Sequence, residues 1–280
     1  MSLYFGHLSS ARVNHGSDAS LDNLQNGALT VLVLARQRDR VSNRYLAIKG
    51  NGVTWYFYST SLGRIAFVNN RATTDDTFQS GFEEGFPLNE WRWVAVTFDN
   101  AASGNDRVYL YASAVTGSLT ETTYSAQTAG SGANGDDASS DLFVGNLSTA
   151  NSSWPGDIAY VHVVAARMSL EELRHHQSCP FHPHASTKLL VRYAGDADSA
   201  AVDLSGNGNR GQLIGAIPSL APQPLLWPGR PEQPLLPCSR WERSWFLPSG
   251  VAAAAGQPTM RRWGGIPGMT PGPMRAGRSW

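Results

Sequence analysis

The segment from Asn89 to Asp99 is the strongest predicted β-strand in the chain. Its side chains alternate between two faces, and both faces are largely apolar, which indicates a strand inside a sheet with other structure packed over each side. After a turn-like stretch, a second alternating segment runs from Arg107 to Ala112. The two segments predict a β-hairpin at the centre of an all-β core. Its two faces are Val94, Val96 and Phe98 on one side and Trp91, Trp93, Ala95 and Thr97 on the other.

Further predicted strands surround this hairpin, with turn signals between them and almost no helical periodicity. Such regular spacing is typical of a two-sheet antiparallel sandwich or jelly roll. In the segment 53–59, Tyr56 and Tyr58 lie on the face opposite Trp55 and Phe57. The predicted strands are 29–35, 44–49, 53–59, 65–68, 142–145 and 158–164.

One segment has a clear helical signal. Ser169 and Glu172 form a capping box, in which a hydroxyl and a carboxylate satisfy free backbone amides at a helix start, and Pro180 stops the helix. A short helix over about 169–177 is therefore predicted. The stretch 125–141 is rich in Gly, Ser, Ala and Asp, and it is predicted to be an exposed loop.

Six segments follow one another in a defined order: Gly27–Ala35, Trp91–Asp99, Val108–Tyr111, Leu142–Asn146, Pro155–Ala159 and Met168–Leu173. This order resembles a laminin-G-like domain of the concanavalin A-like jelly-roll superfamily, over about residues 1–178. The resemblance implies two antiparallel sheets whose loops, in some relatives, bind sugar or calcium.

A seventh stretch, Val202–Asn209, also resembles this family, in which such a stretch usually lies near the start of the domain. Here it lies after the predicted helix. We expect it to join a late strand pair within 188–215, formed by 189–193 and 211–214. The predicted sandwich domain then covers residues 1–217.

The composition changes sharply at Pro218. Twelve of the 16 prolines and five of the nine tryptophans fall in 218–280, where proline disfavours both helix and sheet. This part has seven arginines and two acids, a net charge of +5, whereas 1–217 has 15 basic and 20 acidic residues, a net charge of −5. We expect an extended basic arm that docks on the acidic bodies of neighbouring copies or other structural subunits, in preference to nucleic acid. Its anchors would be Trp227, Trp241, Trp245, Arg261, Arg262, Trp263 and Trp280.

No set of catalytic residues is found. A glycosidase on this fold needs two suitably spaced carboxylates facing one cleft, whereas Glu83 and Glu84 are adjacent in a Gly-flanked loop. The serine elbow Gly-x-Ser-x-Gly does not occur. Residues 175–184 contain five potential zinc ligands, but their irregular spacing and two prolines favour a surface loop. The chain is predicted to be no enzyme and to need no cofactor, apart from the calcium that the resemblance allows.

Sugar binding needs an exposed aromatic ring beside polar groups, because the apolar face of a sugar stacks on such a ring. Trp154, with Asn146 and Asn151, is the best candidate set. The alternative interpretation is that Trp154 fills the core at the start of a strand.

Calcium would require oxygen ligands from several loops, and the resemblance allows such a site at Asp18, Asp22 and Asp157. The segment that begins at Asp203 has oxygen ligands at alternate positions, like the first half of a calcium loop. Its twelfth position is Ile214 and not a glutamate, which favours a turn held by polar side chains.

These observations predict a non-enzymatic structural or adhesive module of a repeated assembly, resembling the decoration and fibre proteins of phage particles. The alternative is a lectin-like protein that recognises a cell-surface glycan through its loops. Neither a secretion signal nor a membrane-spanning run occurs in the sequence, so a virion protein made in the cytoplasm is expected. A cytoplasmic protein, or an extracellular one without a signal peptide, is the alternative. The two cysteines are expected to be plain thiols.

Overall fold

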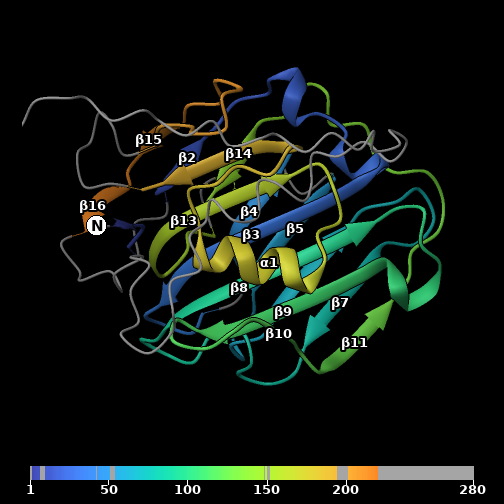
Figure 1. Cartoon of the computed structure of the whole chain (residues 1–280), viewed down its shortest axis with the longest axis horizontal. Helices are drawn as coiled ribbons and strands as arrows, with labels where there is room; N and C mark the ends of the chain where they lie inside the picture. Colours follow the sequence, from blue (N-terminus) through green and yellow to red (C-terminus); the bar gives the residue numbers. More distant parts are fainter. Residues whose placement is uncertain are drawn as a thin grey trace, which may run out of the picture. The chain divides into compact units, whose positions relative to one another are not determined.

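The computed structural model describes residues 2–6, 10–41, 43–50, 54–147, 149, 152–193 and 201–219. All of them lie in one compact unit, Met1–Leu235, and the rest of the chain is outside the described residues. The unit is a jelly-roll sandwich of two antiparallel β-sheets (Figure 1). No helix in the described part of the chain is long and apolar enough to cross a membrane.

The first sheet, named sheet A here, contains the predicted central hairpin. Its order is β10 (Thr120–Glu121), β9 (Val108–Ala114), β8 (Trp91–Asp99), β3 (Ala28–Gln37), β13 (Gly156–Val164), β1 (Ser2–Tyr4) and β16 (Ile217–Ser219), with β14 (Thr187–Arg192) also paired to β13.

The second sheet, sheet B, lies opposite. Its order is β11 (Tyr124–Thr128), β7 (Asp76–Ser80), β6 (Ile65–Asn69), β5 (Trp55–Ser59), β4 (Arg44–Lys49), β12 (Leu142–Val144), β2 (Arg12–Asn14) and β15 (Gln212–Ile214). The helical elements are the 3₁₀ turns η1 (Ala19–Leu21), η2 (Leu24–Asn26) and η3 (Gly104–Arg107), and the α-helix α1 (Leu170–Ser178).

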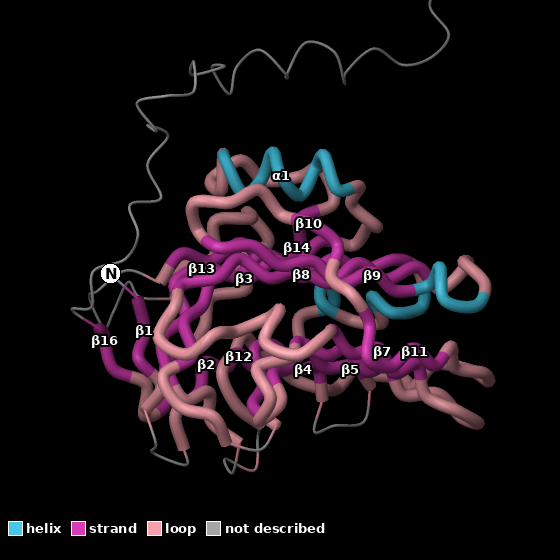
Figure 2. The backbone as a smooth tube through the Cα atoms, turned by 90° about the horizontal axis from the view of Figure 1, so that it is seen from below, coloured by secondary structure: helices cyan, strands magenta, loops and turns pink. Residues whose placement is uncertain are grey.

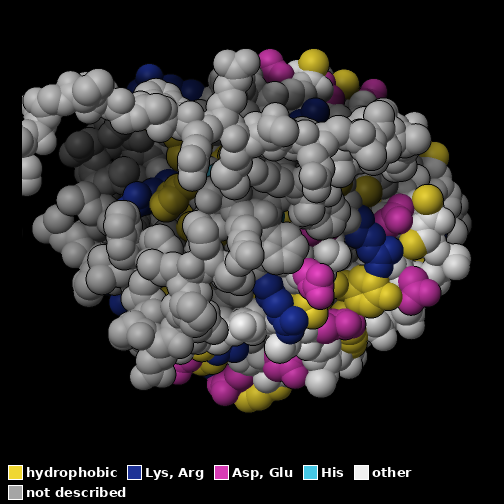
Figure 3. Space-filling view, viewed as in Figure 1, with side chains coloured by type: hydrophobic (Ala, Val, Ile, Leu, Met, Phe, Trp, Pro, Cys, Tyr) yellow, Lys and Arg dark blue, Asp and Glu magenta, His cyan; other side chains and the backbone are white. Residues whose placement is uncertain are grey.

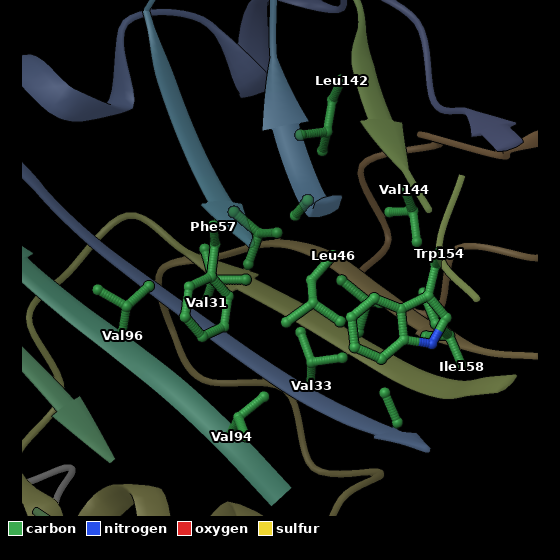
Figure 4. Close-up of a cluster of buried hydrophobic side chains, with 14 of the residues drawn as sticks. Val31, Val33, Leu46, Phe57, Val94, Val96, Leu142, Val144, Trp154 and Ile158 are labelled. Carbon is green, nitrogen blue, oxygen red and sulfur yellow. The ribbon is translucent and has the colours of Figure 1, made fainter. Parts of the chain in front are cut away.

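Strand β8 confirms the prediction of two apolar faces. It pairs with β3 along its whole length, from Trp91 opposite Arg36 to Asp99 opposite Ala28. One face contributes Val94 and Val96 to the main core between the sheets (Figure 4). The other face contributes Trp93 to a second apolar layer.

That second layer lies under α1, which covers the outer face of sheet A (Figure 2). Trp93 packs edge-on against Tyr160, with ring centroids 5.3 Å apart, and Leu173 of α1 closes the layer. The predicted capping box starts this helix: Ser169 N–H donates to Glu172 Oε2 at 2.7 Å, and Glu172 N–H donates to Ser169 Oγ at 3.3 Å. The molecule therefore has three layers, α1, sheet A and sheet B.

Two local predictions are wrong. Part of the expected loop 125–141 forms β11, an edge strand that pairs with β7. The expected late strands both exist, but they do not pair with each other, because β14 joins β13 in sheet A and β15 joins β2 in sheet B.

The segment between those two strands forms the expected polar turn. Asp203 Oδ1 accepts hydrogen bonds from the Leu190 and Ser205 amides at 3.1 and 2.9 Å, and its Oδ2 accepts from the Asn209 amide at 2.9 Å. The carboxylate is saturated by the protein itself, as a turn requires.

Candidate functional site

Trp154 lies in the core, which contradicts its predicted role as a sugar-stacking platform. Its side chain is 0% exposed and lies among core residues such as Ile158 (Figure 4). Its ring packs edge-on against Phe86 at a centroid distance of 4.8 Å. The indole N–H donates to the Arg36 carbonyl at 3.3 Å. A large ring gains more free energy inside the sandwich than on its surface. The alternative interpretation, a residue that fills the core, is the one the structure shows.

Asn146 is also fully buried, so the structure contradicts its assignment to an exposed sugar site. Its Nδ2 donates to Ser153 Oγ at 2.7 Å, and its Oδ1 accepts from the Ser152 amide at 2.9 Å. The side chain closes the turn before β13. Asn151, the third predicted residue, lies outside the described residues.

The contacts of Asp157 speak against its predicted role as a calcium ligand. It is buried at the start of β13 between two arginines of the neighbouring chain segment. Its Oδ2 lies 2.9 Å from Arg36 Nη2 and 2.8 Å from Arg38 Nε, and its Oδ1 lies 3.0 Å from Arg38 Nη2. Both oxygens are already bound by guanidinium groups.

The other two predicted calcium ligands lie beyond the opposite end of β3. Asp18 caps η1 by accepting from the Ser20 amide at 2.8 Å, and Asp22 forms an ion pair with Lys49 at 3.0 Å. Among the described residues, neither of them has a contact in common with Asp157, which pairs with Arg36 near the end of β3. The three cannot share one ion. Over the described ranges, no group of three or more His, Cys, Asp and Glu is placed to hold a metal.

A buried lysine, Lys49, lies at the end of the sandwich near Asp22. Lys49 is 0% exposed, and besides Asp22 it lies close enough to Asp137 to affect that carboxyl. Burial raises the pKa of Asp137, and the nearby ammonium partly opposes this effect. Lys49 thus supplies a cation among these carboxylates.

Of the histidines predicted to lie in a surface loop, His176 is buried between α1 and sheet A, whereas His175, His182 and His184 are half-buried. His162 of β13 and His176 of α1 face each other with ring centroids 5.1 Å apart, and His184 lies 6.3 Å from His176. Burial, followed by the neighbouring histidines, lowers the pKa of His176 to about 4 and that of His162 well below its usual value. Cys179 is disulfide-bonded, which corrects the expectation of a plain thiol. His162 and His176 are therefore neutral at pH 7.

The outer face of sheet B carries a cluster of tyrosines, which we name the tyrosine platform: Tyr45 of β4 and Tyr56 and Tyr58 of β5. The ring centroids of Tyr56 lie 5.5 Å from those of Tyr45 and 5.4 Å from those of Tyr58, and Tyr45 and Tyr58 are 6.0 Å apart. Tyr45 and Tyr56 are half-buried, whereas Tyr58 is 8% exposed. Their packing holds the rings in fixed positions before any ligand arrives.

Strand alternation explains the direction of these rings. Trp55 and Phe57 point into the main core, so Tyr56 and Tyr58 between and after them point away from it. The sequence contains this signal, since 53–59 was predicted to alternate in this way, but it does not reveal which face is the exterior. Tyr45 joins them through the register of β4 with β5, in which it lies opposite Tyr58.

The neighbouring strands complete the surface with small and polar side chains. Ala66 and Val68 of β6 lie opposite Tyr58 and Tyr56 and belong to the same cluster. Beyond them, Gln79 and Thr77 of β7 lie opposite Ala66 and Val68. The result is an aromatic floor with an amide and a hydroxyl at its border.

The platform also offers hydrogen-bonding groups. In the part of the chain that the structure describes, none of the three tyrosine hydroxyls has a hydrogen-bond partner. Partial burial raises the pKa of all three, that of Tyr56 to about 12, so each phenol keeps its proton at pH 7. Each hydroxyl can then both donate and accept a hydrogen bond.

The two outer sheet faces differ in what covers them. The outer face of sheet A is covered by α1 (Figure 2), and on the side that Figure 3 shows, the acidic and basic side chains of the described residues are interspersed. The tyrosine platform is on the other side of the sandwich. It is the candidate functional site.

Comparison with known proteins identifies a fold. No family model matches the chain, and no curated protein matches it in sequence. A presumed carbohydrate-binding protein from Bacteroides ovatus matches in structure, with a TM-score of 0.51 and 12% identity, over 79% of this chain and 60% of that one. The two chains share a fold. The present chain spans about 60% of that protein's length.

Two other solved structures match less closely. The CBM40 of the Ruminococcus gnavus IT-sialidase has a TM-score of 0.41 and 17% identity, over 57% of this chain and 91% of that one. A heptameric pentraxin from Limulus polyphemus has a TM-score of 0.43 and 12% identity, over 64% and 82%. At these scores neither match establishes a relationship.

Proposed function

We propose that this chain is a non-catalytic carbohydrate-binding module, and that the saccharide binds to the tyrosine platform on the outer face of sheet B. The observation that carries the proposal is the arrangement of Tyr45, Tyr56 and Tyr58 on the outer face of sheet B. Their rings pack on one another, and among the described residues their hydroxyls have no hydrogen-bond partner. The Bacteroides ovatus protein of similar fold, itself presumed to bind carbohydrate, supports the proposal.

The chemistry of a sugar ring fits this surface. A pyranose has one or two faces of C–H groups that pack on an aromatic ring, and its hydroxyls lie around the edge. The platform supplies rings below and polar groups at the border, namely the phenols, Gln79 and Thr77. Because the rings are already packed together, little side-chain entropy is lost when a sugar binds.

The test is binding to a glycan array, followed by titration calorimetry with the best ligand. Tyr56→Ala removes the central ring, and we expect the affinity to fall by about 10-fold or more, since losing an aromatic anchor typically costs roughly 2 kcal/mol. Tyr109→Ala is the matched control, because Tyr109 is also half-buried and also pairs with a tyrosine, Tyr111, at 6.4 Å, but on sheet A. Equal loss in both variants, or no loss in either, contradicts the proposal.

A second candidate function rests on the uneven charge of the chain, −5 in residues 1–217 and +5 in residues 218–280. In this function the chain is a structural or adhesive subunit of a repeated assembly, such as a virion decoration or fibre protein, and its C-terminal arm docks on neighbouring copies. The residues of that arm from 220 onward are outside the described part of the chain.

Light scattering tests this second function. A chain that ends at Ser219 retains β16, which pairs with β1, and so retains the edge of sheet A. The arm hypothesis predicts an oligomer for the full chain and a monomer for the shortened chain. If both are monomers, the assembly function is wrong for this protein alone, whereas the glycan-binding proposal is unaffected.

A further inference from the structure

Arg64 borders the tyrosine platform. It lies two positions before Ala66, and its carbonyl accepts from the Thr60 amide at 3.0 Å, which continues the β5–β6 ladder by one step. Residues two apart on a strand lie on the same face, so Arg64 extends the outer face of sheet B next to Ala66. Since Ala66 lies opposite Tyr58, Arg64 is at the Tyr58 end of the platform.

The guanidinium of Arg64 is not neutralised. Its Nη1 donates to Gln79 Oε1 at 3.1 Å, which is an uncharged acceptor, and no carboxylate of the described residues pairs with it. Its Nε is buried and lacks a hydrogen-bond partner among those residues. Other arginines of the described residues do pair with a carboxylate, as Arg36 does with Asp157.

A buried donor without an acceptor is costly, and an anion near the guanidinium offers the strongest compensation. A guanidinium is a planar fork of donors that matches the two oxygens of a carboxylate or sulfate. Gln79 holds the fork beside the rings, because its amide oxygen also accepts from Ser125 Oγ at 3.2 Å and is thereby fixed in position.

We propose that the tyrosine platform selects acidic saccharides, with Arg64 binding the carboxylate or sulfate group of a sugar stacked on Tyr58 and Tyr56. This inference rests on the proposed function and names its ligand class. The charges also fix the orientation of the ligand. The exposed Asp75 is close enough to Tyr56 to act on it electrostatically, and its negative charge repels an anion from that end. The acidic group of the ligand therefore lies at the Tyr58 end, and its neutral part lies at the Tyr56 end.

The experiment uses the full chain and pairs of oligosaccharides that differ only in charge. One pair is a galacturonate hexamer and its methyl ester, and the other is a chondroitin sulfate hexasaccharide and its desulfated form. Calorimetry is carried out with the unchanged chain and with Arg64→Gln. The matched control is Arg167→Gln, because Arg167 lies over the ring of Tyr109 at 4.7 Å on sheet A and so reproduces an arginine beside a tyrosine pair.

We expect the unchanged chain to bind the acidic member of at least one pair about 10-fold more tightly, the effect of one charge-assisted hydrogen-bonded contact. The pair that shows it distinguishes carboxylate from sulfate. Arg64→Gln should abolish the preference and leave the affinity for the neutral member unchanged, whereas Arg167→Gln should change neither.

Equal affinity for the acidic and neutral members, or a preference that survives in Arg64→Gln, overturns the inference. The proposed function still stands in that case if Tyr56→Ala weakens binding of the neutral member. Failure of the unchanged chain to bind any of the four probes also overturns the inference, and failure on a full glycan array overturns the proposed function with it.

Discussion

Buried histidines should make this sandwich less stable in mild acid. His15 and His176 are each almost fully buried, and burial lowers the pKa of both from 6.5 to about 4. The unfolded chain therefore binds more protons than the folded protein between these pH values, and the free energy of unfolding falls as the pH drops through this window. At pH 5 the loss is about 2 kcal/mol for each histidine and about 4 kcal/mol for the two.

Two other buried groups change the size of this loss of stability, in opposite directions. His162 is buried between the same layers and has its pKa lowered too, so it adds to the loss. Asp137 acts in the opposite direction, because burial raises its pKa and its protonation then favours the folded state. Carboxylates with lowered pKa values, such as Asp76, contribute only at lower pH.

Urea unfolding at pH 7.5 and at pH 5 measures this loss. His176→Phe keeps a buried ring that cannot take up a proton, so between the two pH values it should lose about 2 kcal/mol less stability than the unchanged protein. An unfolding free energy that is the same at both pH values, within about 1 kcal/mol, refutes the reasoning. A full pH dependence in His176→Phe would show that other groups cause it.

Three further predictions concern stability. Asp157→Asn leaves Arg36 and Arg38 without their shared carboxylate, and urea unfolding should show a loss of roughly 3 kcal/mol or more; a change below about 1 kcal/mol would mean that the pair behaves like a surface ion pair. Ser169→Ala removes the N-cap of α1 and should cost about 1 kcal/mol in the same assay. Trp154→Phe should lower the melting temperature but leave the glycan affinity of the folded protein unchanged, because Trp154 is buried. A folded variant with a weaker glycan affinity would show that Trp154 takes part in binding.

Much of the fold could be predicted because strand alternation is a local property. Strand β8 and its partner β9 were predicted within two residues, and so was the capped helix α1. The pairing of β14 and β15 with different sheets could not be predicted, because it depends on β13 and β2, which lie far away in the chain. Non-local pairing is set by the packing of the whole sandwich.

Less of the candidate site could be predicted from the sequence. The sequence left open whether Trp154 is an exposed ring or a core residue, and it suggested Asp157 as a calcium ligand. Both residues lie against the end of β3, where Arg36 contacts each of them. Tyr56 and Tyr58 were correctly placed on one face of a strand, yet that face could have been interior or exterior. The difference depends on which residues of the second sheet pack against Phe57, and the sequence does not contain that information in local form.

The two sheets show why the platform lies on sheet B. Both outer faces of the sandwich carry aromatic residues, which are costly to leave in water. On sheet A, α1 removes that cost by covering Trp93. On sheet B, the three tyrosines cover Ala66 and one another, and Tyr45 and Tyr56 remain partly exposed. Their polar hydroxyls make that exposure tolerable. A surface that is apolar at its centre and polar at its edge is stable in water, and it is also the surface that a sugar ring matches.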